Sequence, residues 1–163
     1  MKKIFIFILL IFIFFIVSSM FVKLEVITIN SSSMETEYPK NSNVVAMRPA
    51  FFISKGDVVL HFLPDSAFGE LGDNSLLKNS EYIHKVIAKY GDTVKIKEGK
   101  LLVNNTEVIS NLPDKFLLQD EEIKISVNTY YLIATNDEKI GLTDSLTFGP
   151  FSSEMITGKI LKK

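Results

Sequence analysis

Residues 94–109 read VKIKEGKLLVNNTEVI and predict two consecutive β-hairpins. Apolar residues are spaced as in strands with one buried face, and Glu98-Gly99 and Asn104-Asn105 supply two-residue turns. We therefore expect a mainly β fold, a compact multi-stranded domain whose helices are limited to short turns near 66–72 and 152–156. Similar β-branched segments between turn residues occur at 26–29, 44–47, 57–62, 82–88, 93–96, 100–103 and 130–134.

The composition excludes several classes of protein. A length of 163 residues allows one domain. The absence of cysteine excludes a disulfide framework, a thiolate metal site and a cysteine nucleophile. Two histidines, His61 and His84, are too few for a histidine-rich zinc site, and a net charge of −1 argues against a nucleic-acid partner. No metal and no organic cofactor is implied.

Residues 4–22 (IFIFILLIFIFFIVSSMFV) predict a transmembrane helix, because 17 of these 19 residues are hydrophobic and none is charged. A helix of this length covers about 28 Å, close to the thickness of the hydrocarbon core of a bilayer. Lys2 and Lys3 precede the segment, so the positive-inside bias places the N-terminus in the cytoplasm. We expect a single-pass protein of the cytoplasmic membrane, with residues 1–23 as the anchor and residues 24–163 as a β-rich domain on the extracytoplasmic side.

A cleavable signal peptide is the alternative interpretation of this segment. The apolar core of a signal peptide is usually about 7–15 residues long and ends at small residues. Val17-Ser18-Ser19 is a poor cleavage site, and apolar residues resume at 20–22. An uncleaved anchor is the stronger prediction, and both interpretations export the remaining residues.

Four short motifs, in order along the chain, carry the functional argument. Serine triplets, Gly-Asp pairs and an isolated Asp-Ser pair are ordinary features of turns and caps, and a lone histidine in a strand is usually a packed side chain. No single motif therefore indicates a function. The motifs are INSSSME (29–35), KGDVVL (55–60), YIHKVI with GDTV (82–87 and 91–94), and TDS followed by FGP and GK (143–145, 148–150 and 158–159).

Together these motifs resemble those of type I signal peptidases, the serine peptidases of the bacterial leader peptidase and conjugal pilin-processing type. The first is similar to the family's Ser-x-Ser-Met motif and the second to its Gly-Asp-Ile-Val-Val-Phe strand. The third is similar to Lys-Arg-Val-x-Gly-x-Pro-Gly-Asp and the last to Asp-Ser-Arg-x-x-Gly. The resemblance implies a membrane-bound hydrolase that processes signal peptides during protein secretion.

The resemblance also implies roles for residues of the first motif. Ser33 takes the position of the nucleophile. The Ser31 hydroxyl and the Ser33 backbone N–H would form the oxyanion hole, where negative charge develops in the tetrahedral intermediate. Met34 would be an apolar side chain on a rim that faces substrate and membrane.

The general base of the family is a lysine, and counting back seven residues from Gly91 places it at His84 in this chain. A lysine must lose about three pKa units to accept a proton at neutral pH, whereas a histidine, with a pKa near 6.5, needs almost none. A histidine base does need a partner on its second ring nitrogen to fix the tautomer. By its place in the last motif, Asp144 is the candidate for that partner.

Two other residues compete with His84 for this role. Neighbouring side chains of a strand point to opposite faces, so only one of His84 and Lys85 can reach Ser33. His61 is a rival base, although packing or solvent exposure is its commoner role in an apolar strand. The His84 assignment is the prediction that follows from the spacing to Gly91.

Several residues of the family pattern are missing from this chain. Leu146 stands where an arginine follows the Asp-Ser pair, and residues 88–90 read AKY instead of Gly-Leu-Pro. Two functions are therefore expected. The first is a serine endopeptidase acting on exported preproteins, which would bind as an added strand beside the lipid bilayer. The second is a catalytically degenerate, membrane-tethered module for binding or assembly.

Overall fold

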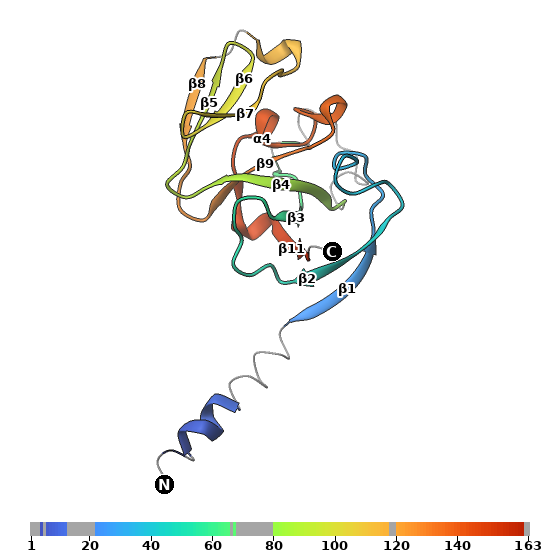
Figure 1. Cartoon of the computed structure of the whole chain (residues 1–163), viewed down its shortest axis with the longest axis vertical. Coiled ribbons are helices and arrows are strands. Elements are labelled where there is room, and N and C mark those ends of the chain that lie inside the picture. Colours follow the sequence, from blue (N-terminus) through green and yellow to red (C-terminus); the bar gives the residue numbers. More distant parts are fainter. Residues whose placement is uncertain are drawn as a thin grey trace.

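The computed structural model describes residues 4, 6–12, 22–65, 67, 80–117 and 120–161. Strands dominate this part of the chain and form two antiparallel sheets (Figure 1). The larger sheet has seven strands in the order β1-β2-β11-β3-β4-β9-β10, and the smaller has four in the order β7-β6-β5-β8. The mainly β class is confirmed. The strands are β1 (Lys23–Thr28), β2 (Asn43–Arg48), β3 (Val58–His61), β4 (Tyr82–Lys89), β5 (Thr93–Lys97), β6 (Lys100–Val103), β7 (Thr106–Ile109), β8 (Glu121–Lys124), β9 (Thr129–Ile133), β10 (Phe151–Ser152) and β11 (Ile156–Ile160).

The smaller sheet is formed by the chain between β4 and β9, two strands that pair with each other in the larger sheet. The two predicted hairpins are confirmed, because β5 pairs with β6 and β6 with β7. Their turn residues Glu98, Gly99, Asn104 and Asn105 have φ values of 52°, 70°, 51° and 63°. Positive φ at both central positions is what a two-residue hairpin turn requires.

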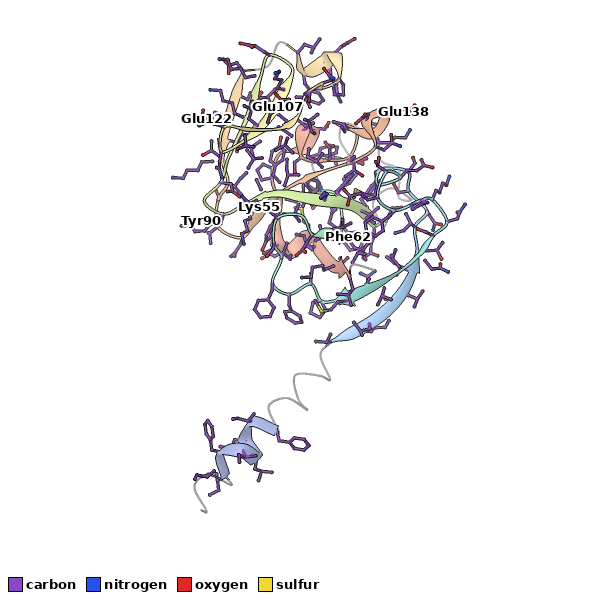
Figure 2. The ribbon with its side chains drawn as sticks, in the orientation of Figure 1. Lys55, Phe62, Tyr90, Glu107, Glu122 and Glu138 are labelled. Atoms are coloured by element: carbon purple, nitrogen blue, oxygen red, sulfur yellow. The ribbon has the colours of Figure 1, made fainter. Side chains whose placement is uncertain are left out.

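Asp92 fixes the junction between the two sheets. Its carboxylate accepts hydrogen bonds from the Lys89 N–H at 3.0 Å, the Asn104 amide at 2.6 Å and Lys55 Nζ at 3.1 Å. Burial raises the pKa of Asp92, but these donors outweigh it and hold the pKa below its ordinary value. Figure 2 shows Lys55 and Tyr90 on this side of the molecule, where β4 ends.

The sequence did not predict β8 (EEIK) or β11 (ITGKI). β11 is nevertheless central, because it pairs with both β2 and β3. Gly158 makes this possible: a Cβ at this position would lie 3.2 Å from side-chain carbons of Leu60 and Arg48. A glycine, which weakens a strand on propensity alone, is thus used where the neighbouring strands approach closely.

Two clusters of buried apolar side chains cover opposite faces of β3 and β4, and we name each after one member. Because side chains alternate along a strand, Ile83 contributes to one cluster and Val86 to the other. The Met34 cluster consists of Ile29, Met34, Val44, Ala46, Val58, Leu60, Ile83 and Ile160. The Phe151 cluster consists of Val59, Leu63, Ala67, Val86, Leu132, Phe151 and Ile156.

Helical structure in the described domain is limited to short turns: η1 (Asp114–Phe116), η2 (Asp137–Lys139), α4 (Ser145–Phe148) and η3 (Ser153–Met155). The turn expected near 152–156 is confirmed, and Ser152 caps it by accepting the Glu154 N–H at 3.3 Å. Of the turn expected at 66–72, only Ala67 is described, and it is helical.

Residues 4 and 6–12 of the N-terminal segment are helical, and their apolar side chains are exposed. Most of the remaining predicted anchor lies outside the described residues, and Lys23 is already the first residue of β1. Among the residues that the structure describes, none of the helices has the length and apolar character needed to cross a membrane.

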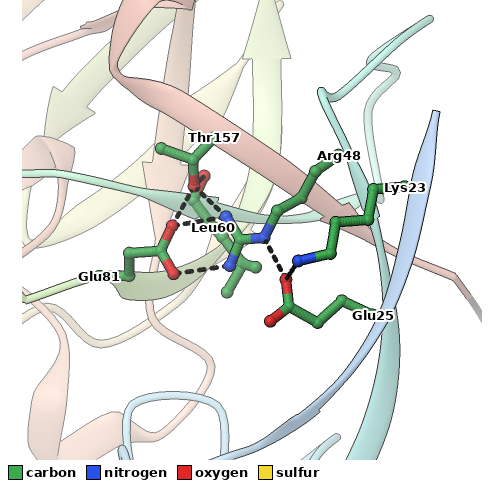
Figure 3. A network of polar contacts seen from close by, with 6 residues as sticks. All are labelled: Lys23, Glu25, Arg48, Leu60, Glu81 and Thr157. Atoms are coloured by element: carbon green, nitrogen blue, oxygen red, sulfur yellow. Dashed lines mark hydrogen bonds and ion pairs between the residues drawn. The ribbon is translucent and has the colours of Figure 1, made fainter. Parts of the chain in front are cut away.

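A polar network around Arg48, the single arginine of the chain, joins one end of the larger sheet (Figure 3). The guanidinium forms two hydrogen bonds with the Glu81 carboxylate, at 2.6 and 2.7 Å. It also bonds Glu25 at 3.2 Å and Thr157 at 2.9 Å. β1, β2, β11 and the residue before β4 are therefore held together at this point.

Candidate active site

Ser31 and Ser33 lie together in the turn that follows β1. Their hydroxyl oxygens are 2.8 Å apart, and the Ser33 N–H donates to Ser31 Oγ at 3.1 Å. Ser33 is only 5% exposed, and its hydroxyl donates to the backbone carbonyl of Ile83 at 3.0 Å. The two hydroxyls and the Ser33 N–H, which the family resemblance implies for the nucleophile and the oxyanion hole, are thus within hydrogen-bond distance of one another.

The turn that carries Ser31 and Ser33 lies beside the point where β4 and β9 stop pairing. The β4–β9 pairing ends at Lys85 opposite Ile133, and the residues after Ile133 are no longer part of a strand. There the Ser33 carbonyl accepts the N–H groups of Thr135 and Asn136, at 2.9 and 3.0 Å. The Asn136 amide adds a hydrogen bond to the Ser32 carbonyl at 2.9 Å. Ser33 is therefore placed at the backbone edge of β4, beside the peptide that links Ile83 to His84.

His84 is fully buried on the opposite side of β4 from the Ile83 side chain. Its Nδ1 lies 2.7 Å from Nε2 of His61, whose own Nδ1 lies 2.9 Å from the carbonyl oxygen of Phe62. The second ring nitrogen of His84, Nε2, has no hydrogen-bond partner among the described residues. Burial, and secondarily the neighbouring His61, hold the pKa of His84 well below 6.5, so its imidazole is neutral at neutral pH.

Lys85 follows His84 and points to a different environment. Its Nζ forms an ion pair with Glu37 at 2.5 Å, and both side chains are about one-third exposed. Lys85 also lines a cavity of about 410 Å³ with Thr135 and Asp137, and this cavity touches neither Ser31 nor Ser33. Within the described part of the chain, no hydrogen bond joins Ser33 to either Lys85 or His84.

Asp144 is buried and serves as the N-cap of α4. Its carboxylate accepts the backbone N–H groups of Leu146 at 3.1 Å, Gly141 at 2.9 Å and Ala134 at 3.3 Å. Burial raises the pKa of Asp144, and these three donors oppose the rise. The expected Asp144–His84 hydrogen bond is not formed in the described structure, because the carboxylate faces backbone donors and His84 Nδ1 faces His61.

Met34 is also placed differently from the expectation. It is fully buried in the Met34 cluster, and its sulfur lies 3.7 Å from the Thr135 hydroxyl. The side chain therefore packs the turn onto the sheet instead of forming an exposed rim. The physical reason is the turn at residues 32–38, whose Met34 carbonyl accepts the N–H groups of Glu37 and Tyr38 and directs the side chain inward.

A second cavity, of about 350 Å³, begins at Ser31. The last residues of β1 and the turn form one wall, and the start of β4 forms the other. Apolar side chains of Ile27, Ile29, Leu60 and Ile83 line it, together with Glu81 and Ser80. Of the two serines of the turn, Ser31 lines this cavity and Ser33 does not. Among the described residues, no group of three or more histidine and acidic side chains could hold a metal ion.

Comparison with known proteins agrees with the motifs. A family model described as "Signal peptidase, peptidase S26" matches residues 1–162. The chain belongs to the signal peptidase family.

One curated relative and one solved structure are similar to this signal peptidase family member. Thylakoidal processing peptidase 1 of Arabidopsis thaliana, a chloroplastic protein, is 24% identical over 144 residues, which are 81% of this chain and 39% of the relative. The chain thus spans well under half of that protein's length. A crystal structure of a signal peptidase I from Enterococcus faecalis has 14% identity and a TM-score of 0.45, covering 69% of this chain and 99% of that one.

Two features of the candidate site were not predicted from the sequence of this signal peptidase family member. Asn136 holds the serine turn through its amide, and the only sequence signal was its place shortly before the last motif. The contact between His61 and His84 was also missed, although the chain has just these two histidines. Predicting it requires the register of β3 against β4, which places Val59 opposite His84 and His61 opposite Tyr82.

Proposed function

We propose that this chain is a membrane-bound serine endopeptidase that cleaves signal peptides from exported preproteins, with Ser33 as the nucleophile and His84 as the general base. The observation that carries the proposal is the position of Ser33. Its buried hydroxyl lies against the Ser31 hydroxyl and against the peptide that leads into His84, whose Nε2 has no partner among the described residues. Buried polar atoms normally have hydrogen-bond partners, so the unpaired Nε2 of His84, the residue that follows Ile83, is our choice of proton acceptor.

The mechanism requires two local changes before the chemistry begins. Ser33 Oγ–H leaves the Ile83 carbonyl and reaches His84 Nε2, which needs a shift of the serine turn or of the imidazole because that ring lies on the opposite side of β4 from the Ile83 side chain. The Ser33 N–H, which donates to Ser31 Oγ at 3.1 Å, is released to face the oxyanion. Catalytic hydrogen bonds are often long or absent without substrate and tighten in the complex. Lys85 is not our choice of base, because an ammonium group in an ion pair with Glu37 has no lone pair to accept a proton.

The proposed reaction has two steps with balanced protons. Ser33 Oγ attacks the scissile carbonyl carbon while its proton passes to His84 Nε2, and the Ser31 hydroxyl and Ser33 N–H donate to the oxyanion. His84 then gives the proton to the departing amine, leaving an acyl-enzyme. Water hydrolyses this ester with His84 again as the base, which restores Ser33 and releases the signal peptide.

The 350 Å³ cavity supports the substrate class. An extended peptide can hydrogen-bond to backbone at the end of β1 while small apolar side chains fill the space over Ile29 and Ile83. We propose that the preprotein binds here, with its cleavage site beside Ser33. The apolar segment at 4–22 would anchor the enzyme in the cytoplasmic membrane with its N-terminus inside and the peptidase domain on the extracytoplasmic side. The processing function named for the thylakoidal relative agrees with this proposal.

The test is cleavage of a preprotein panel by the full chain, purified in detergent, as wild type, Ser33→Ala and His84→Ala. We expect loss of at least about 10³-fold in kcat for Ser33→Ala and about 10²-fold or more for His84→Ala. Lys89→Ala, on β4 but away from the serine turn, is the matched control and should keep wild-type activity. A wild type that cleaves no preprotein, with all variants folded, would favour the non-catalytic binding or assembly module.

A further inference from the structure

We infer that His61 is the residue that positions His84, through a chain of hydrogen bonds that runs from the Phe62 carbonyl to His61 and on to His84. The inference rests on the proposed function, because it concerns how the proposed base is held. It gives His61, which β3 carries, the role that the family pattern suggested for Asp144. His61 does not contact substrate in this scheme and acts only through His84.

The direction of each hydrogen bond in this chain follows from the Phe62 carbonyl, which can only accept a hydrogen bond. A carbonyl oxygen can only accept, so Nδ1 of His61 carries the proton that it shares with the Phe62 carbonyl. In neutral His61, Nε2 is then the acceptor, and at 2.7 Å it must receive the Nδ1–H of His84. Nε2 of neutral His84 is left with a lone pair and no proton, which is the tautomer that a general base requires.

The surroundings hold both rings in this arrangement. His61 and His84 are both 0% exposed. The His61 ring packs edge-on against Phe151 at a centroid distance of 4.5 Å and lies 6.2 Å from the Tyr82 ring. The pair comes from diagonal positions on one face of β3 and β4, a relation that the strand register fixes. The His61 ring cannot turn over without disturbing its contact with Phe151.

Asp144 does not fill this role in the described arrangement, because its carboxylate accepts three backbone N–H groups and Nδ1 of His84 is bonded to His61 instead. Replacing a carboxylate with a neutral imidazole changes the chemistry. His61 fixes the tautomer of His84 but supplies no negative charge to stabilise the imidazolium that forms when His84 takes the Ser33 proton. Among the described residues, the titratable groups acting on the pair are Glu81, whose charge favours a protonated His61, and the Tyr82 ring.

The arrangement also requires that His61 stay neutral. A protonated His61 would carry hydrogen on Nε2 and could no longer accept from His84, so the chain of hydrogen bonds would break. Burial lowers the pKa of His61 to about 4, against a rise caused by the Phe62 carbonyl. Activity is therefore expected to persist below pH 6.5 and to fall only toward the pKa of the histidine pair, a lower limit than an exposed histidine base would show.

The experiment compares wild type, His61→Phe and His61→Gln as full chains in detergent. Phenylalanine keeps the ring volume but has no acceptor, whereas the glutamine carbonyl can replace the acceptor near the Nε2 position. Each protein is measured for kcat, for its pH profile and for the tautomer of His84 by ¹⁵N NMR of the imidazole. Circular dichroism establishes that each variant is folded.

We expect wild-type His84 to carry its proton on Nδ1 at pH 7. His61→Phe should mix the tautomers and lower kcat by about 10-fold to 10²-fold with little change in KM, and His61→Gln should recover part of both. A merely structural role would not give this rescue or move the tautomer. If His61→Phe does not fold, the wild-type tautomer decides, because a proton on Nε2 of His84 overturns the inference outright.

The outcomes separate this inference from the proposed function. If Ser33→Ala and His84→Ala abolish cleavage while folded His61→Phe keeps wild-type kcat, pH profile and tautomer, only the role of His61 is refuted. If His84→Ala cleaves as well as wild type, the proposed base is refuted, whatever His61→Phe does. The tautomer itself is read from the folded protein and needs no substrate.

Discussion

Asp144 is the residue whose role differs most from its motif. Its carboxylate joins three points of the chain, namely the end of β9 at Ala134, the turn at Gly141 and the first turn of α4 at Leu146. Such a cap satisfies backbone donors that would otherwise be buried without partners. At the scale of single residues, the same amino acid in the same motif can thus serve the fold instead of the reaction.

Asp144→Asn tests this difference. Asparagine keeps one acceptor oxygen, so part of the cap survives, and we expect the free energy of unfolding to fall by about 1–2 kcal/mol in urea denaturation. The tautomer of His84 and the pH profile of cleavage should match wild type. A loss of kcat above about 10³-fold in a variant of unchanged stability would instead return Asp144 to the role of catalytic partner.

At the scale of elements, Arg48 links strands that are far apart in the sequence. Its two parallel hydrogen bonds to Glu81 place the residue before β4 against β2, and Glu81 is part of the wall of the 350 Å³ cavity. Hydrogen bonds from Arg48, with that of Thr157, lower the pKa of Glu81, although burial opposes them. The network therefore fixes one side of the proposed peptide groove.

Arg48→Lys keeps the charge but removes the fork that bonds both oxygens of Glu81. Because the Arg48 side chain is only 22% exposed, we expect a loss of about 1–2 kcal/mol of unfolding free energy. Lys97→Ala is the control, since its 3.8 Å pair with Glu98 is exposed and should contribute less than about 0.5 kcal/mol. Equal effects of the two substitutions would show that the Arg48 network does not stabilise the sheet.

At the scale of the whole molecule, the histidine pair couples stability to pH. Both histidines are held neutral in the folded protein, with pKa values below the 6.5 of an exposed imidazole. The unfolded chain therefore binds protons at a higher pH than the folded chain does. Stability is complete above pH 6.5 and is lost as the pH falls toward the folded pKa, which for His61 is about 4.

Urea denaturation between pH 8 and pH 4.5 measures this loss. His61 alone is expected to contribute on the order of 3 kcal/mol across the full interval from 6.5 to its folded pKa. Glu81 and Asp92, the carboxylates with lowered pKa, protonate below their ordinary values, whereas buried Asp144, whose pKa is raised, changes stability with pH in the opposite sense. His61→Phe should flatten the profile, and a wild-type stability that stays constant from pH 7 to pH 4.5 would contradict the neutral buried pair.

Local patterns were enough to predict much of the fold. Alternating apolar residues and turn residues located β4, β5 and β6, because strand period and turn geometry depend on a few adjacent residues. They failed for β8, whose sequence EEIK lacks the alternation, and for β11, which contains Gly158. These two strands form because neighbouring strands supply the partners and the close packing.

For the candidate site as well, some features follow from the sequence and others only from the tertiary structure. The sequence by itself determined that Ser31 and Ser33 share one turn, and that His84 and Lys85, as neighbours in a strand, face opposite ways. Only the tertiary structure decided that His61 lies against His84, that Asp144 caps α4 and that Met34 is buried. The physical reason is register: a shift of one residue between β3 and β4 would turn His61 to the other face, and motif order along a chain does not encode that pairing.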